Sequence, residues 1–123
     1  MNNLIIDAAS DKIFFTIMAD NDSYTSEFIN NRENFDKLTI LIIKFLEKHE
    51  LNIKNISNIF VNQGPGKFSS IRATLSTAKA FSFANKIDLY GFNSNQIIGK
   101  NYAKIIDLFN KGLLIKNLIK PQY

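Results

Sequence analysis

The sequence predicts an α/β domain in which helices pack on a mixed five-stranded sheet. Residues 4–29 contain three short strand-like segments separated by polar turns, which is the pattern of an antiparallel meander. Beyond them, apolar strand-like segments alternate with longer helical patterns, which is typical of parallel strands joined by crossover helices. The chain has 123 residues and is 46% hydrophobic, a size and composition that fit one domain with its own core.

The three early strands follow one another closely. Leu4–Ile6 is a short apolar run that ends at Asp7, and Ile13–Met18 is rich in β-branched and aromatic residues. The small and polar residues between them favour a tight hairpin turn. Tyr24–Ile29 alternates polar and apolar residues, so we expect it to form the third strand.

The first long helical pattern runs from Phe35 to His49, with Asn34 as the expected N-cap. Apolar residues recur there at helical spacing, and further apolar residues widen the stripe: Leu38, Leu41, Ile42 and Phe45, then Ile40, Ile43 and Leu46. Two interpretations stay open. The helix is either wedged into the domain's own core, or it has one face on the sheet and another on a second protein.

The second half of the chain alternates strands and helices. Ile59–Val61 is expected to be a buried strand, and a helix rich in small residues begins at Phe68 or Ser69 and ends at Asn85. Ile87–Phe92 is expected to be the fifth strand. A third helix is expected from residues 93–94 to about residue 110. The apolar and basic tail, residues 111–123, has no firm assignment.

Composition excludes several classes of site. The sequence has no cysteine, and its one histidine is His49. Disulfides, thiolate metal sites, cysteine nucleophiles and histidine-based zinc sites are therefore excluded. We expect no metal site and no cofactor. The formal net charge is +4, but the lysines are scattered, so nucleic-acid binding by charge alone is the less favoured interpretation.

The N-terminus lacks the basic segment and long apolar run of a signal peptide. The longest apolar run, around Ile40–Ile43, is far shorter than the roughly 20 residues that cross a bilayer. We therefore expect a cytoplasmic protein that does not enter a membrane.

The turn Gly64-Pro65-Gly66-Lys67 resembles a phosphate-binding loop only superficially. A P-loop needs a glycine where Val61 stands and a serine or threonine where Phe68 stands, and the dinucleotide-binding glycine fingerprint is also missing. Two interpretations remain: an anion site at the following helix N-terminus, or a tight turn without a ligand.

Asp7, at the end of the first strand, has two interpretations as well. It is a carboxylate that holds a metal or polarises water near a phosphate, or it caps the turn that follows. Asp11 is the only acidic residue close to it in the sequence.

Two segments together resemble the TsaB (YeaZ) family. Residues 4–10, Leu-Ile-Ile-Asp-Ala-Ala-Ser, are similar to that family's opening strand and turn, and residues 59–72 are similar to its GxGPGSFTGLR signature. Residues 78–80 and 90–94 match the helix and strand that follow. The resemblance covers about residues 3–96. Lys67 and Ser70 depart from the signature, and Asn34 stands where the family commonly has a histidine.

The resemblance implies one half of an actin-like ATPase fold of the Hsp70/sugar-kinase superfamily. Residues 1–95 would form this TsaB-like domain, and residues 96–123 would be a C-terminal helix and short tail, the remnant of a second domain. The implied function is a non-catalytic scaffold in the formation of threonylcarbamoyladenosine on tRNA. The implied partners are a TsaD-like transferase subunit, in a heterodimer, and a TsaE-like ATPase. The chain would contact tRNA only indirectly and could form a homodimer when alone.

The resemblance also assigns roles to residues. In that family the two N-terminal helices pack against the partner, so the expected contact residues lie on the first two helices: Leu38, Leu41, Ile42, Phe45, Ile71, Thr74, Leu75, Ala78 and Phe81. The residues of the signature turn are Gly64, Pro65, Gly66, Phe68 and Arg72, and Asp7 is the residue expected near a nucleotide. No catalytic residue is expected.

The rival hypothesis is a small autonomous phosphotransferase that binds a nucleotide with Asp7 and the Gly64–Gly66 turn. A self-sufficient homodimer and a decayed remnant without a partner are further alternatives.

Overall fold

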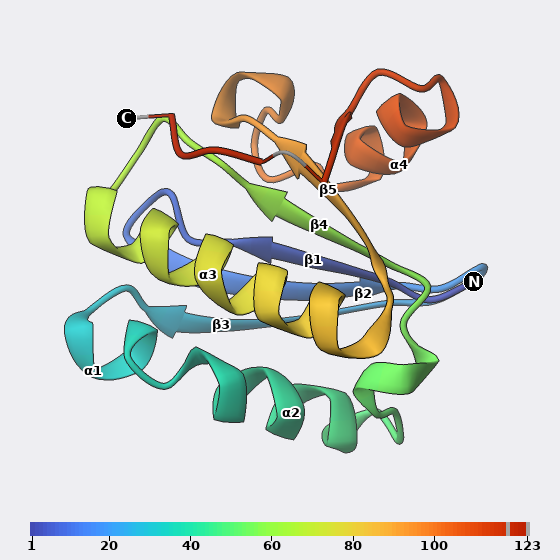
Figure 1. The fold of residues 1–123 in the computed structure, drawn as a ribbon, viewed down its shortest axis with the longest axis horizontal. Coiled ribbons are helices and arrows are strands. Elements are labelled where there is room, and N and C mark those ends of the chain that lie inside the picture. Colours follow the sequence, from blue (N-terminus) through green and yellow to red (C-terminus); the bar gives the residue numbers. More distant parts are fainter. Residues whose placement is uncertain (118, 123) are drawn as a thin grey trace.

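The structure is a computed structural model that describes residues 1–117 and 119–122 (Figure 1). Within these described residues, six strands and four helices follow one another, with short 3₁₀ turns at residues 53–55 and 94–96. Their bounds are β1 (Asn3–Asp7), β2 (Lys12–Met18), β3 (Ser23–Ile29), α1 (Arg32–Phe35), α2 (Leu38–Lys48), β4 (Asn58–Asn62), α3 (Phe68–Asn85), β5 (Asp88–Phe92), α4 (Ala103–Asn110) and β6 (Ile115–Lys116).

The strands form one mixed sheet in the order β3-β2-β1-β4-β5-β6. The meander β1-β2-β3 is antiparallel, while β1, β4 and β5 are parallel to one another. This arrangement confirms the predicted meander and the predicted crossover connections. The predicted number of five strands was wrong by one, because the two-residue β6 pairs antiparallel with β5. A strand this short has no periodicity that a sequence pattern could reveal.

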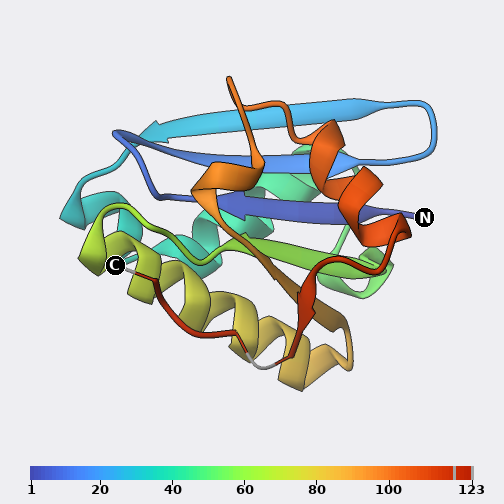
Figure 2. The same ribbon diagram turned by 90° about the horizontal axis from the view of Figure 1, so that it is seen from above.

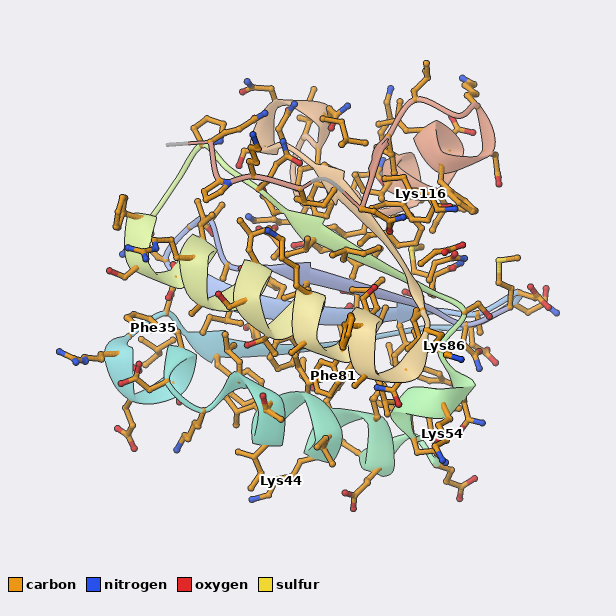
Figure 3. The ribbon with its side chains drawn as sticks, viewed as in Figure 1. Phe35, Lys44, Lys54, Phe81, Lys86 and Lys116 are labelled. Carbon is orange, nitrogen blue, oxygen red and sulfur yellow. The ribbon has the colours of Figure 1, made fainter. Side chains whose placement is uncertain are left out.

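Helices α2 and α3 cover one face of the sheet (Figure 1). Leu4 and Ile6 of β1 point to this face, where Ile42 of α2 and Leu75 of α3 belong to the same buried cluster. Figure 3 shows Phe81 between α3 and α2, whereas Lys44 projects from α2 away from the sheet. The two helices therefore bury one side each and leave the other in solvent.

The opposite face is covered by α4 and the segment before it (Figure 2). Ile5 of β1 and Phe60 of β4 lie in this second cluster with Ile105 of α4. Successive residues of a strand point to opposite faces, so β1 and β4 are buried on both sides. This double burial explains why both strands are continuous apolar runs in the sequence. No helix among the described residues is long and apolar enough to cross a membrane.

Two predicted helices differ from the structure. The segment predicted as one helix from Phe35 to His49 is divided between α1 and α2, because the backbone of Lys37 is not helical (φ −126°, ψ 35°). Asn31 rather than Asn34 caps α1: the Asn34 N–H donates to Asn31 Oδ1 at 2.9 Å. The segment predicted as a helix from residues 93–94 to about 110 is helical only from Ala103, since the chain adopts positive φ at Gly99 and Lys100. The predicted helix that ends at Asn85 is confirmed as α3.

Candidate functional site

The carboxyl ends of β1 and β4 meet at one edge of the sheet, beside the 3₁₀ turn at residues 94–96. A cavity of about 270 Å³ opens there. It is lined by Ala9, Ser10, Asn62, Pro65, Ser94, Ile97, Gly99 and Lys100. In open α/β sheets, ligands bind in the crevice outside the carboxyl ends of parallel strands, so this cavity is the candidate site.

Asp7 lies beneath the cavity and is completely buried. Its Oδ1 accepts hydrogen bonds from Asn62 Nδ2 at 2.9 Å and from the Ala9 N–H at 3.3 Å. Its Oδ2 accepts from the Tyr102 hydroxyl at 2.6 Å and from Lys100 Nζ at 3.3 Å. Both carboxylate oxygens are therefore occupied by groups of the chain itself. By accepting from the Ala9 N–H, the Asp7 side chain caps the β1–β2 turn, which is one of its two predicted interpretations.

The Asp7 carboxylate affects the protonation of the Tyr102 hydroxyl that donates to it. Burial, the nearby charge of Asp7 and the hydrogen bond to Asp7 together raise the pKa of the Tyr102 phenol far above its ordinary value of about 10. The folded protein thus holds the phenol neutral, as a donor to the carboxylate.

We expect Tyr102→Phe to lower the free energy of unfolding at pH 7 by about 2 kcal/mol, the value of a hydrogen bond to a charged group. The raised pKa means that the wild-type phenol keeps its proton when the unfolded one loses it. Its contribution is therefore complete below about pH 10 and declines as the pH rises further. Urea unfolding between pH 7 and 11 should show a shallower decline for the variant. If the unfolding free energies of wild type and variant fall in parallel between pH 7 and 11, the phenol is not held protonated by Asp7.

The signature turn packs directly on the β1–β2 turn. The Lys67 N–H donates to the Ala9 carbonyl at 3.1 Å, and a Cβ built at Gly66 would lie 2.7 Å from Ala9 Cβ and closer still to the Ala9 carbonyl oxygen. Gly64 has φ of +106°, its N–H donates to Asn62 Oδ1 at 2.8 Å, and the Gly64–Pro65 peptide is cis. Gly66 thus allows the two turns to touch, which favours the interpretation of a structural turn.

The remaining signature residues lie outside this cavity. Phe68 is half-exposed at the start of α3, and the Arg72 guanidinium sits over its ring at 5.4 Å. Ser70, a departure from the signature, donates to the Ala8 carbonyl at 2.8 Å. Its hydroxyl therefore adds another tie to the β1–β2 turn.

Asn30, directly after β3, supports the site structurally, and the sequence patterns missed it. Its Nδ2 donates to the carbonyls of Ala8 and Ser10 at 2.9 and 2.7 Å and also lies 3.0 Å from Ser70 Oγ. The end of β3 thus holds the β1–β2 turn from the other side. Its sequence context, a polar stretch after a strand, gives no sign of this role.

Most of the expected partner-contact residues lie in the chain's own core. Leu41 and Phe81 are only partly buried and pack against the edge of that core. The buried ones are Leu38, Ile42, Phe45, Ile71, Thr74, Leu75 and Ala78. A rigid partner that docks on the outer surface would not touch these seven side chains. Exposed apolar residues on the same two helices are Ile40, Ile43, Phe68 and Phe83.

A divalent metal does not fit this site. Among residues 1–117 and 119–122, no group of three histidine, aspartate or glutamate side chains is placed to hold an ion. Asp11, the nearest acidic residue in sequence, is almost fully exposed and pairs with Lys67 Nζ at 3.1 Å instead. Asp7 is left as a lone carboxylate with its oxygens already engaged.

Comparisons with known proteins agree on one family. The sequence profile described as "TsaD: tRNA N6-adenosine threonylcarbamoyltransferase" matches residues 29–104. The tRNA N6-adenosine threonylcarbamoyltransferase of Pediococcus pentosaceus is 32% identical over 75 residues, which are 61% of this chain and 21% of that protein. The tRNA threonylcarbamoyladenosine biosynthesis protein TsaB of Buchnera aphidicola subsp. Schizaphis graminum is 28% identical over 69 residues, 56% of this chain and 33% of that protein.

The fold is also that of a solved relative. YeaZ from Pseudomonas aeruginosa superimposes with a TM-score of 0.73 at 14% sequence identity, over 90% of this chain and 50% of YeaZ. This likeness confirms the predicted half of an actin-like fold. The chain spans half of that solved structure and a third or less of the two sequence relatives.

Proposed function

The chain belongs to the TsaD and TsaB/YeaZ family, and from this premise we propose that it is a non-catalytic scaffold subunit in the formation of threonylcarbamoyladenosine on tRNA. The proposed partner is a TsaD-like transferase subunit, bound as a heterodimer. A TsaE-like ATPase joins the assembled complex, and contact with tRNA is made through the partners.

One observation carries the proposal: the outer sides of α2 and α3 expose apolar side chains beside small ones. Phe83 is 90% exposed, and Ile40 and Ile43 are also exposed. On α3, Phe83 shares a stripe at helical spacing with Ser76 and Ala80, which are exposed too. We call Ile40, Ile43, Ser76, Ala80 and Phe83 the outer helix face.

The outer helix face has the composition of a helix–helix interface. Large apolar side chains supply the area removed from water, and the small residues of α3 let a second helix approach its backbone closely. The inner sides of α2 and α3 pack against the sheet and leave no apolar surface there for a second protein. The inner side of α2 packs in the chain's own core. The exposed residues of its outer side support the proposal that this side contacts a second protein.

Engagement of Asp7 by the chain's own groups supports the non-catalytic part of the proposal. A general base or metal ligand needs a free oxygen, and both oxygens of this carboxylate accept hydrogen bonds from buried or partly buried donors.

We expect Ile43→Asp and Phe83→Asp to reduce binding to the TsaD homologue of the same organism at least tenfold each. A buried charge at a helix interface costs on the order of 2 kcal/mol or more. Co-expression followed by co-purification and a titration of the purified pair measures this effect. Phe83 is 90% exposed, so Phe83→Asp should keep the wild-type melting temperature; Ile43 is 38% exposed, so a melting curve must first show that Ile43→Asp is folded.

The matched control is Ile98→Asp. Ile98 is 87% exposed, but it lies in the loop beside the strand-end cavity, away from α2 and α3. Equal loss of binding in all three variants, or none in Ile43→Asp and Phe83→Asp, would refute the assigned interface. Co-purification of differently tagged copies of this chain without the TsaD homologue would favour the homodimer.

The cavity at the strand ends keeps an autonomous phosphotransferase as the second candidate. Its Ser10 and Ser94 hydroxyls and the Lys100 ammonium are groups that could contact a phosphate. Calorimetry with ATP and magnesium on the isolated chain separates the two functions. Tight binding with turnover in the absence of any partner would overturn the scaffold proposal.

A further inference from the structure

The strand-end site contains a cation of its own. Lys100 Nζ lies 3.3 Å from Asp7 Oδ2, and Asp7 is the completely buried member of the pair, whereas the lysine side chain is 39% exposed. We propose that the Lys100 ammonium is the resident counter-ion of Asp7 and excludes a divalent metal from this carboxylate.

The ammonium is surrounded by groups that suit it. Besides Asp7, it donates to Ser10 Oγ at 3.2 Å and lies 5.1 Å from the centre of the Phe14 ring. A carboxylate, a hydroxyl and an aromatic face together can orient an ammonium group. These three groups belong to β1, to β2 and to the turn between them. Lys100, which lies just before α4, therefore packs its side chain over the β1–β2 turn.

The backbone of Lys100 is held in a conformation that lysine seldom adopts. Its φ is +60°, in the left-handed region, which costs a residue with a Cβ about 1 kcal/mol. The Tyr102 N–H donates to the Lys100 carbonyl at 3.0 Å, which ties this backbone to the residue whose hydroxyl also contacts Asp7. A glycine would fit this φ without strain. The contacts of the Lys100 ammonium are therefore what offset the strain of a lysine at this position.

A count of acceptor positions explains the exclusion. A carboxylate offers about four lone-pair positions, and Asp7 uses them for Asn62, Ala9, Tyr102 and Lys100. The first three donors are held by strand ends or by the buried second core. Of these four donors, only the Lys100 side chain is substantially exposed, so its ammonium occupies the one position on the carboxylate that a cation from solvent could take.

The test uses Mn²⁺ as a paramagnetic probe and the full chain labelled with ¹⁵N. At about 1 mM Mn²⁺, in the range of weak protein sites for divalent cations, wild-type amide signals of Asp7, Ala9 and Asn62 should show no selective broadening. Lys100→Gly fits the positive φ and removes the ammonium, and Lys100→Asn does the same with a polar side chain. Both variants should gain selective broadening at these three amides.

Lys104→Ala is the matched control, because Lys104 lines a different groove on the α4 side and should behave as the wild type does. Selective broadening in the wild type overturns the proposal without any variant. Unbroadened spectra of folded Lys100→Gly and Lys100→Asn also overturn it. The site lies apart from the outer helix face, so the Lys100 variants should still co-purify with the TsaD homologue.

If the wild-type chain itself does not co-purify with the TsaD homologue, the proposed function fails, and the proposal about Lys100 is unaffected.

Discussion

Replacing Gly66 with valine is expected to lower the free energy of unfolding by about 3 kcal/mol, the upper range for overpacking a tight contact. A Cβ at this position would overlap the Ala9 carbonyl oxygen, which is backbone and cannot rotate away. The same carbonyl accepts the Lys67 N–H, so moving the turn outward would also break that hydrogen bond. Urea unfolding followed by circular dichroism measures the loss.

Gly112→Ala separates steric overlap from the general cost of losing a glycine. Gly112 has φ of +69°, but a Cβ there would meet no atom within 4 Å. The expected loss is about 1 kcal/mol, from the left-handed backbone alone. A Gly66 variant no less stable than Gly112→Ala would show that the two turns are not held in contact as described.

Replacing Phe60 with alanine is expected to cost about 3–5 kcal/mol, the range for removing a fully buried aromatic side chain. The ring stacks on Tyr90 at 5.4 Å and meets Phe109 edge-on at 5.3 Å, so it joins β4 and β5 to the end of α4. Single domains are stable by only about 5–15 kcal/mol in total. The variant should therefore melt at a much lower temperature.

Phe83→Ala is the control for Phe60→Ala, since Phe83 is also a phenylalanine but is 90% exposed. Its change in unfolding free energy should stay within about 0.5 kcal/mol. Similar losses in the two variants would contradict the assignment of Phe60 to the second core and of Phe83 to the surface.

Strands β1 to β5 were predictable because each of them carries a local signal, which the two-residue β6 lacks. Residues 4–6 and 59–61 are apolar without alternation, which the double burial of β1 and β4 explains. The helix boundaries were less predictable, because Asn31 and Asn34 are equally good caps in sequence and only the packing at the end of β3 decides between them: Asn34 Nδ2 donates to the Ile29 carbonyl.

The candidate site was predictable at Asp7 and the glycine turn but not beyond them. Asn62 follows β4 as Asp7 follows β1, so the shared edge of parallel strands could have brought the two together. Lys100 and Tyr102 reach Asp7 from 93 and 95 residues away. No spacing rule links such distant positions, because only the packing of the segment before α4 on the second face brings them to the strand ends.

The pairing of β1 has a consequence for synthesis on the ribosome. Its antiparallel neighbour β2 follows within a short turn, but its parallel neighbour β4 pairs Asn3 with Asn58. The nascent meander therefore leaves the edge of β1 that will pair with β4 open while α1 and α2 are translated. At about 5–20 residues per second this edge waits seconds for its partner. Helix α2 does not close this edge, because its apolar side packs on the face of the sheet that holds Leu4 and Ile6.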